Sequence, residues 1–85
     1  MVLTSATLFT AAAPAQAANG TPGQTETVCA DELAVRSTAG GAWFDYLYRG
    51  DHFLVYRVSP SGQWVYGHAY GRVHADGWVH NGWFC

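Results

Sequence analysis

The sequence predicts a small all-β domain closed by a disulfide bond. Turn-forming residues recur every few positions in residues 28–85, and the pieces between them are short and rich in valine and aromatic residues, as is typical of strands. No segment there has sustained helical periodicity. Two cysteines flank this region, and the chain of 85 residues has room for one domain.

Five strands are expected, each bounded by turn residues. The third and fourth should form a hairpin through Ser59-Pro60-Ser61-Gly62, because proline presets one turn dihedral and glycine tolerates positive φ. Five short strands in so few residues indicate a small barrel or a compact sandwich. The expected strands cover residues 33–37, 43–48, 52–58, 63–69 and 77–80.

Alternation along the strands separates two faces. On the third strand, Phe53 and Val55 share one side, and Leu54, Tyr56 and Val58 share the other. Large apolar groups therefore stand on both faces, whereas a small barrel has one interior. Some aromatic side chains must stay partly exposed, and an exposed aromatic patch marks a binding surface.

The cysteines, Cys29 and Cys85, are expected to form a disulfide between the two ends of the domain. Closing a loop of about 57 residues stabilises the fold by roughly 4 kcal/mol in the chain-entropy model. The alternative is a pair of free thiols in a reducing compartment, which the export signal described next disfavours. A zinc site would need further thiolates or nearby histidines at a spacing that the chain lacks.

Residues 1–17 have the character of a signal peptide. They are apolar and uncharged and end in Ala15-Gln16-Ala17, with small residues where signal peptidase requires them, so cleavage is expected after Ala17. No basic residue precedes the apolar run, and we expect the true start to lie upstream. The alternative is an alanine-rich tail without a targeting role. The stretch is too short and too weakly apolar for a stable membrane span.

Residues 18–27 contain no large apolar side chain. Such a segment cannot bury surface, so it is expected to be a flexible linker. The folded domain then spans residues 28–85. Export and cleavage would make the protein secreted, extracellular or associated with the cell wall, without membrane contact after processing, and we expect a monomer.

The charged residues argue against nucleic acid as a partner. The net charge is −2, lysine is absent, and the four arginines are scattered at positions 36, 49, 57 and 72. A nucleic-acid-binding protein would show clustered basic residues. So small a net charge also steers no partner strongly.

Neither a catalytic site nor a cofactor is expected. Oxidised cysteines are not nucleophiles, and no serine lies in a known nucleophile motif. Asp45, Asp51 and Asp76 adjoin turns, where aspartate commonly accepts hydrogen bonds from its own backbone. The sequence therefore favours a protein that is not an enzyme.

Three histidines, His68, His74 and His80, recur every six residues. If the strands ran without bulges, equal parity would place them on one face, and converging imidazoles bind zinc or copper. Gly71 and Gly77 interrupt the segment, so parity is not preserved. We therefore expect no metal site.

Four motifs resemble the family of bacterial SH3 domains, SH3b. Leu33-Ala34-Val35-Arg36-Ser37 is similar to its opening LNVRS strand, and Leu47-Tyr48-Arg49-Gly50-Asp51 resembles its L-x-x-G-[TD] turn. Trp64 stands at the place of a mid-domain tryptophan, and Gly77-Trp78-Val79 resembles the closing GWV strand. The motifs occur in the family's order across residues 33–84.

The resemblance implies a five-stranded SH3-like barrel that binds a ligand without catalysis. Domains of this family often hold secreted enzymes on the cell wall by binding peptidoglycan peptides. This chain departs from the pattern in residues 37–41, which lack the usual proline, and in residues 66–76, which are longer than the usual link. The cysteine pair is an addition to the family's pattern.

Aromatic residues supply the candidate ligand site. In the implied barrel, alternation turns Trp64 and Tyr66 away from inward Val65, and Trp78 away from inward Val79. The candidate groove consists of Trp43, Asp45, Tyr46, Tyr48, Trp64, Tyr66 and Trp78. The aspartate would bind a ligand amine at the rim.

We therefore expect a secreted binding module for a cell-wall peptide or an extracellular protein. The alternative is a small secreted inhibitor or antibacterial effector that uses a disulfide-closed β scaffold.

Overall fold

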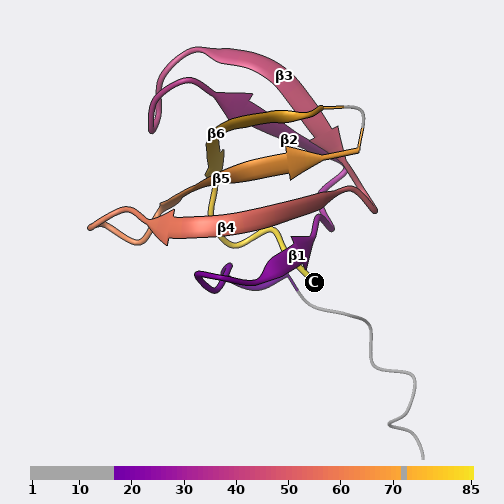
Figure 1. Cartoon of the computed structure of the whole chain (residues 1–85), viewed down its shortest axis with the longest axis horizontal. Coiled ribbons are helices and arrows are strands. Elements are labelled where there is room, and N and C mark those ends of the chain that lie inside the picture. The colour runs from indigo at the N-terminus through magenta and orange to yellow at the C-terminus, as the bar shows by residue number, and fades with distance from the viewer. Residues whose placement is uncertain (1–16, 72) are drawn as a thin grey trace, which may run out of the picture.

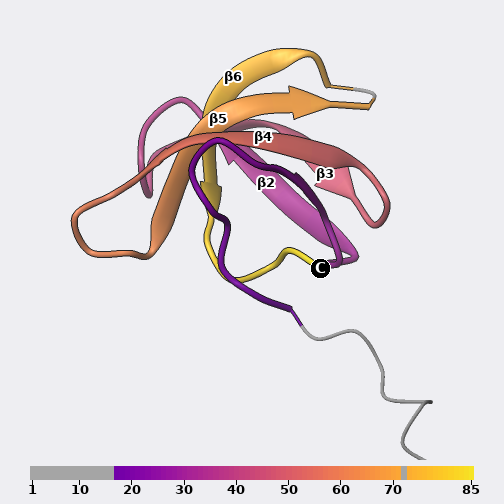
Figure 2. The same cartoon turned by 60° about the horizontal axis from the view of Figure 1, so that its bottom comes forward.

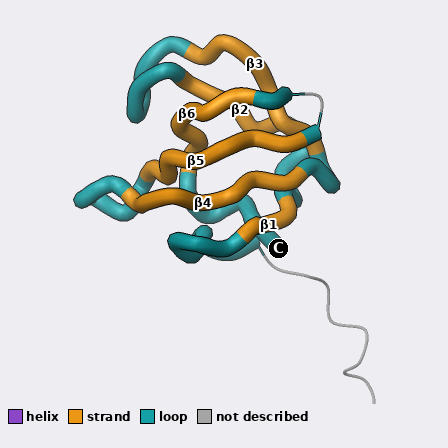
Figure 3. Tube along the Cα trace, viewed as in Figure 1, coloured by secondary structure: helices purple, strands orange, loops and turns teal. Residues whose placement is uncertain are grey.

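The computed structural model describes residues 17–71 and 73–85, and this part of the chain is all-β (Figures 1 and 3). The expected signal peptide lies outside the described residues except for Ala17. Within the described residues, no helix is long and apolar enough to cross a membrane. The strands are β1 (Thr25–Thr27), β2 (Glu32–Arg36), β3 (Trp43–Tyr48), β4 (His52–Val58), β5 (Trp64–Tyr70) and β6 (Ala75–His80).

The six strands form one antiparallel sheet in the order β1-β4-β5-β6-β2-β3. The five expected strands correspond to β2 through β6, with bounds that differ by at most two residues. Figure 2 shows how strongly the sheet curls. Its end strands, β1 and β3, are not hydrogen-bonded neighbours. Hydrogen bonding thus gives an open six-stranded sheet where we expected a barrel of five strands.

The curled sheet encloses a core of aliphatic and aromatic side chains. Val65 and Val79 are completely buried, as strand alternation predicts. Phe84 follows the last strand and stacks on Phe53, with 5.9 Å between the ring centroids. The largest fully buried side chains are Phe53, Phe84, Leu47, Val28, Val35, Val55, Val65 and Val79.

Residues 18–27 belong to the fold, which corrects the expectation of a flexible linker. Strand β1 pairs with β4, so that Glu26 lies opposite Phe53. The backbone N–H of Ala18 donates to the carbonyl of Phe84 at 2.6 Å, and that of Phe84 donates back at 3.0 Å. Amino-acid composition does not reveal this segment as structured, because backbone hydrogen bonds hold it in the fold and no large apolar side chain is needed.

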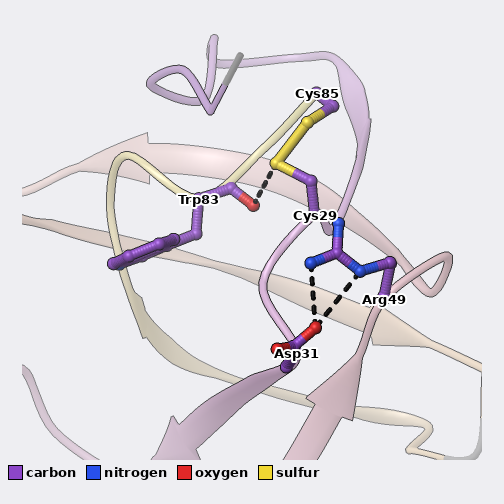
Figure 4. Close-up of polar contacts among 5 residues, drawn as sticks. All are labelled: Cys29, Asp31, Arg49, Trp83 and Cys85. Carbon is purple, nitrogen blue, oxygen red and sulfur yellow. Dashed lines mark hydrogen bonds and ion pairs between the residues drawn. A yellow bond between two sulfur atoms is a disulfide. The ribbon is translucent and has the colours of Figure 1, made fainter. Parts of the chain in front are cut away.

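The disulfide between Cys29 and Cys85 is confirmed (Figure 4). Two backbone hydrogen bonds support the same connection: the Cys29 N–H donates to the Trp83 carbonyl at 2.9 Å, and the Cys85 N–H donates to the Thr27 carbonyl at 2.8 Å. The C-terminal segment therefore runs beside the end of β1 (Figure 1). The disulfide holds the C-terminal segment in the position that places Phe84 in the core.

A β-bulge in β4 changes which side chains face outward. The register against β5 shifts between Val55 and Arg57. Tyr56 and Arg57 are consequently both exposed, whereas Val58 packs against the core. The simple alternation that groups Val58 with Leu54 and Tyr56 is wrong here, because a bulge inserts one residue into the strand.

Candidate functional site

The outer face of β4, β5 and β6 carries three contacting, mutually tilted rings and one arginine. We call this group the Tyr66 cluster: Tyr56, Arg57, Tyr66 and Trp78. Tyr66 and Trp78 are directly opposite each other in the sheet, and their ring centroids are 5.2 Å apart. The Tyr56 ring lies 5.8 Å from that of Tyr66. The Arg57 guanidinium carbon is 4.6 Å from the Tyr66 centroid and 5.4 Å from the Trp78 centroid, within the range of cation–π attraction.

The local sequence explains why these rings meet. Residues of β5 alternate between half-buried and buried, so Tyr66 faces outward between Val65 and Gly67. A Cβ on Gly67 would overlap the carbonyl oxygen of Leu54, so only glycine allows β4 to approach β5 this closely. The bulge of β4 lies beside this contact and places Tyr56 against the Tyr66 ring.

Trp64 extends the face toward the β5–β6 end that holds His80. The His80 ring lies opposite Trp64, with centroids 4.7 Å apart. The Arg36 guanidinium of β2 lies 5.5 Å from the Trp64 centroid and donates a 2.7 Å hydrogen bond to the Gly41 carbonyl. Trp64 therefore has a cationic neighbour, Arg36, and one N–H group of that arginine is already hydrogen-bonded within the protein.

Asp76 is the acidic group closest to the Tyr66 cluster. It lies opposite His68, whose Nδ1 is 2.7 Å from the Asp76 carboxylate. The Tyr56 hydroxyl donates to the same carboxylate oxygen at 3.4 Å. The pKa of Tyr56 is raised above its ordinary value of 10.0, first by burial against its neighbours and then by the charge and hydrogen bond of Asp76.

A second aromatic group lies on β3. The Trp43 and Tyr46 rings are 4.9 Å apart, and those of Tyr46 and Tyr48 are 6.5 Å apart. Trp43 is 55% exposed. The Asp45 carboxylate accepts a 2.8 Å hydrogen bond from the backbone N–H of Tyr46. Asp45 is paired with completely buried Val35 of β2, so the expected amine-binding aspartate stands on the opposite side of β3 from the Tyr46 ring.

The seven predicted groove residues thus form two groups. Tyr66 and Trp78 are in contact on β5 and β6, with Trp64 beside them on β5, and the other four share β3. Arg36 lies between the groups, because it is paired with Trp43 of β3 and with Trp78 of β6. The described part of the chain contains no pocket. The arrangement is a shallow aromatic face, with charged side chains among the rings.

Sequence reasoning missed Arg57, the charged residue closest to the rings. Unbroken alternation assigns Arg57 to the side of Phe53 and Val55, both completely buried. That assignment would bury a guanidinium without a partner, which is strongly unfavourable. The conflict is itself a sequence signal for a bulge between Val55 and Val58.

The histidines occupy three different environments. His68 pairs with Asp76, His80 packs on Trp64, and the His74 ring lies 6.4 Å from that of Tyr70. Among residues 17–71 and 73–85, no three His, Cys, Asp or Glu side chains gather as a metal site would require.

No protein-family model matches this chain, and no curated protein or solved structure is significantly similar to it. The likeness to SH3b domains depends on the four sequence motifs alone.

Proposed function

We propose that this chain is a secreted, non-enzymatic binding module whose ligand is a cell-wall peptide or an extracellular protein. The observation that carries the proposal is the outer face of β4, β5 and β6, where Tyr56, Tyr66 and Trp78 form contacting rings around Arg57. Tyrosine and tryptophan present large, rigid contact areas with hydrogen-bonding tips and are enriched at binding hot spots.

The lack of a pocket among the described residues favours an extended ligand. Small-molecule sites are usually concave and bury most of their ligand, whereas the described residues form no pocket. A peptide of a wall polymer, or the surface of a protein, can cover a shallow face through several anchors. We therefore favour a macromolecular ligand.

Two further observations support secretion. Ala15-Gln16-Ala17 fits the cleavage rule for signal peptidase. The Cys29–Cys85 disulfide is compatible with an oxidising, extracellular location.

We also propose that the domain is a modified SH3-like barrel. The strands that carry the four SH3b-like motifs are contiguous in the sheet, in the order β5-β6-β2-β3, and the sheet curls around one core (Figure 2). Strand β1 takes the free edge of β4. In this proposal, β1 is an addition to the family's pattern, as the cysteine pair is.

Sedimentation with purified, insoluble peptidoglycan tests the proposed function. We expect the mature protein to sediment with the polymer in a saturable manner and to stay in the supernatant without it. A protein that stays soluble at every polymer concentration would exclude a wall ligand.

That second outcome would favour the alternative, a small secreted inhibitor or antibacterial effector. The disulfide-tied scaffold, with an aromatic face and no pocket among the described residues, also suits a protein target. Assays of bacterial growth and of extracellular enzymes in the presence of the purified protein would then identify the activity.

A further inference from the structure

We infer that Arg57, held over the rings of Tyr66 and Trp78, binds a carboxylate of the wall peptide. The inference rests on the proposed function and deepens it, because it names the chemical group that the face recognises. It also replaces the earlier expectation that Asp45 binds a ligand amine. The cationic residue, not the acidic one, lies on the rings of β5 and β6.

Arg57 has its hydrogen-bonding capacity available. Its guanidinium carbon lies over two rings, and such cation–π contacts leave the N–H groups for a partner. Among the described residues, none forms an ion pair or a side-chain hydrogen bond with Arg57. A planar carboxylate fits such an edge with two parallel, charge-assisted hydrogen bonds.

The other described arginines each donate hydrogen bonds within the protein. Arg49 donates to the Asp31 carboxylate from two nitrogens, at 2.8 and 3.3 Å (Figure 4). Arg36 donates to the Gly41 carbonyl at 2.7 Å. Among the described arginines, Arg57 is therefore the one that keeps all its side-chain N–H donors for a ligand.

The bulge of β4 is an independent observation that points the same way. Bulges re-aim side chains and are common next to functional sites. Here the register shift between Val55 and Arg57 turns the guanidinium from the core side to the outer face. It also exposes Tyr56 beside it, which gives a ligand an apolar surface next to the cation.

The nearby acidic group does not compete for Arg57. The Asp76 carboxylate already accepts from the Tyr56 hydroxyl and contacts His68 Nδ1. Among the described residues, Asp76 forms no ion pair with Arg57, so the guanidinium stays available to a ligand carboxylate. Wall peptides suit it because they carry carboxylates beside small aliphatic side chains, which would pack on the exposed Tyr56 ring.

The test uses purified peptidoglycan in two forms, with its carboxylates intact or converted to primary amides. The full protein is compared with Arg57→Gln, with Arg57→Lys and with the control Arg49→Gln, whose arginine lies in an exposed ion pair away from the rings. We expect Arg57→Gln to weaken binding to intact wall roughly tenfold or more. Arg57→Lys should bind at an intermediate level because it keeps the charge without the planar fork, and Arg49→Gln should match the parent.

Amidation of the wall should weaken binding of the unmodified protein to a similar degree, a result that does not depend on how a variant folds. Equal binding of the parent to both forms of the wall would overturn the inference and leave the proposed function standing. Binding of Arg57→Gln at the parent level would do the same. Failure of the parent to bind intact wall would overturn the proposed function, and with it the inference.

Discussion

Neighbouring residues on β5 have separable roles. Tyr66 faces outward and contacts Tyr56, Arg57 and Trp78, whereas Val65 beside it is completely buried. Removing an outward ring deletes contact area that a ligand would use. Removing an inward side chain leaves a cavity in the core, which destabilises the fold.

The pKa of Tyr56 is sensitive to Asp76, the carboxylate that its hydroxyl contacts on the same face. Its pKa is raised above 10.0 by burial and by Asp76. Asp76→Asn removes the negative charge, so we expect the pKa of Tyr56 to fall toward its ordinary value, as measured by NMR on the tyrosine ring. Asp45→Asn on β3 is the control and should leave the pKa unchanged. An unchanged pKa in Asp76→Asn would contradict the assigned cause.

The raised pKa of Tyr56 also fixes a pH dependence of stability. The folded state holds the Tyr56 proton more tightly than the unfolded chain does. At a pH below the ordinary tyrosine pKa of about 10, Tyr56 is protonated in both states. The contribution of its tighter proton binding to the free energy of unfolding is then fully present. It is lost as the pH rises through the raised pKa. Chemical unfolding of the parent and Asp76→Asn above pH 10 should show a smaller loss in the variant.

At the scale of elements, the sequence predicted the strands that combine turn residues with apolar alternation. Strands β2 through β6 have that pattern, and each lies where it was expected. Strand β1 reads Thr25-Glu26-Thr27 and carries no apolar signal. Its position follows from pairing with β4, which no local pattern can reveal.

The candidate site, like the fold, was predictable only where it follows from simple alternation along a strand. Alternation correctly turned Trp64, Tyr66 and Trp78 away from the buried valines. It could not place Arg57, because the bulge depends on how β4 meets β5. It also could not show that the β3 residues form a separate group, because that depends on strand order.

The N-terminal segment offers a test at this scale. We compare a chain that begins at Ala18 with one that begins at Val28. The shorter chain lacks the β1–β4 pairing and the hydrogen bonds between Ala18 and Phe84, so it exposes the edge of β4 and should melt at a lower temperature. A flexible linker would predict equal melting temperatures, and equality would contradict the structural role of β1.

At the scale of the whole molecule, a disulfide joins the two ends of the chain segment that forms the small core. The Cys29–Cys85 disulfide joins residues separated by 56 positions. Replacing both cysteines by serine should cost about 2–5 kcal/mol, which lowers the melting temperature by roughly 8–40 degrees in a domain of this size. Thermal melts measure the loss.

Mass measurement of the secreted protein before and after reduction checks the disulfide itself, with an expected difference of two hydrogens. Two thiols that react with an alkylating agent in the native protein would contradict it.

Processing is a second property of the whole chain. We expect the mature protein to begin at Ala18, the residue whose backbone is already paired with Phe84. N-terminal sequencing of protein from culture medium tests this. Secreted protein that still carries Met1 would be incompatible with it.

The central claim, that the outer face of β4, β5 and β6 binds the wall ligand, is tested most directly by measuring peptidoglycan binding and melting temperature on the same variants. Trp64→Ala and Tyr66→Ala should each weaken binding by about thirtyfold, the effect of losing 2 kcal/mol at an anchor, with a small change in melting temperature. Val65→Ala should melt lower yet bind normally while folded. If Trp64→Ala and Tyr66→Ala melt far below the parent and lose binding only as they unfold, the rings are packing residues and the claim is wrong.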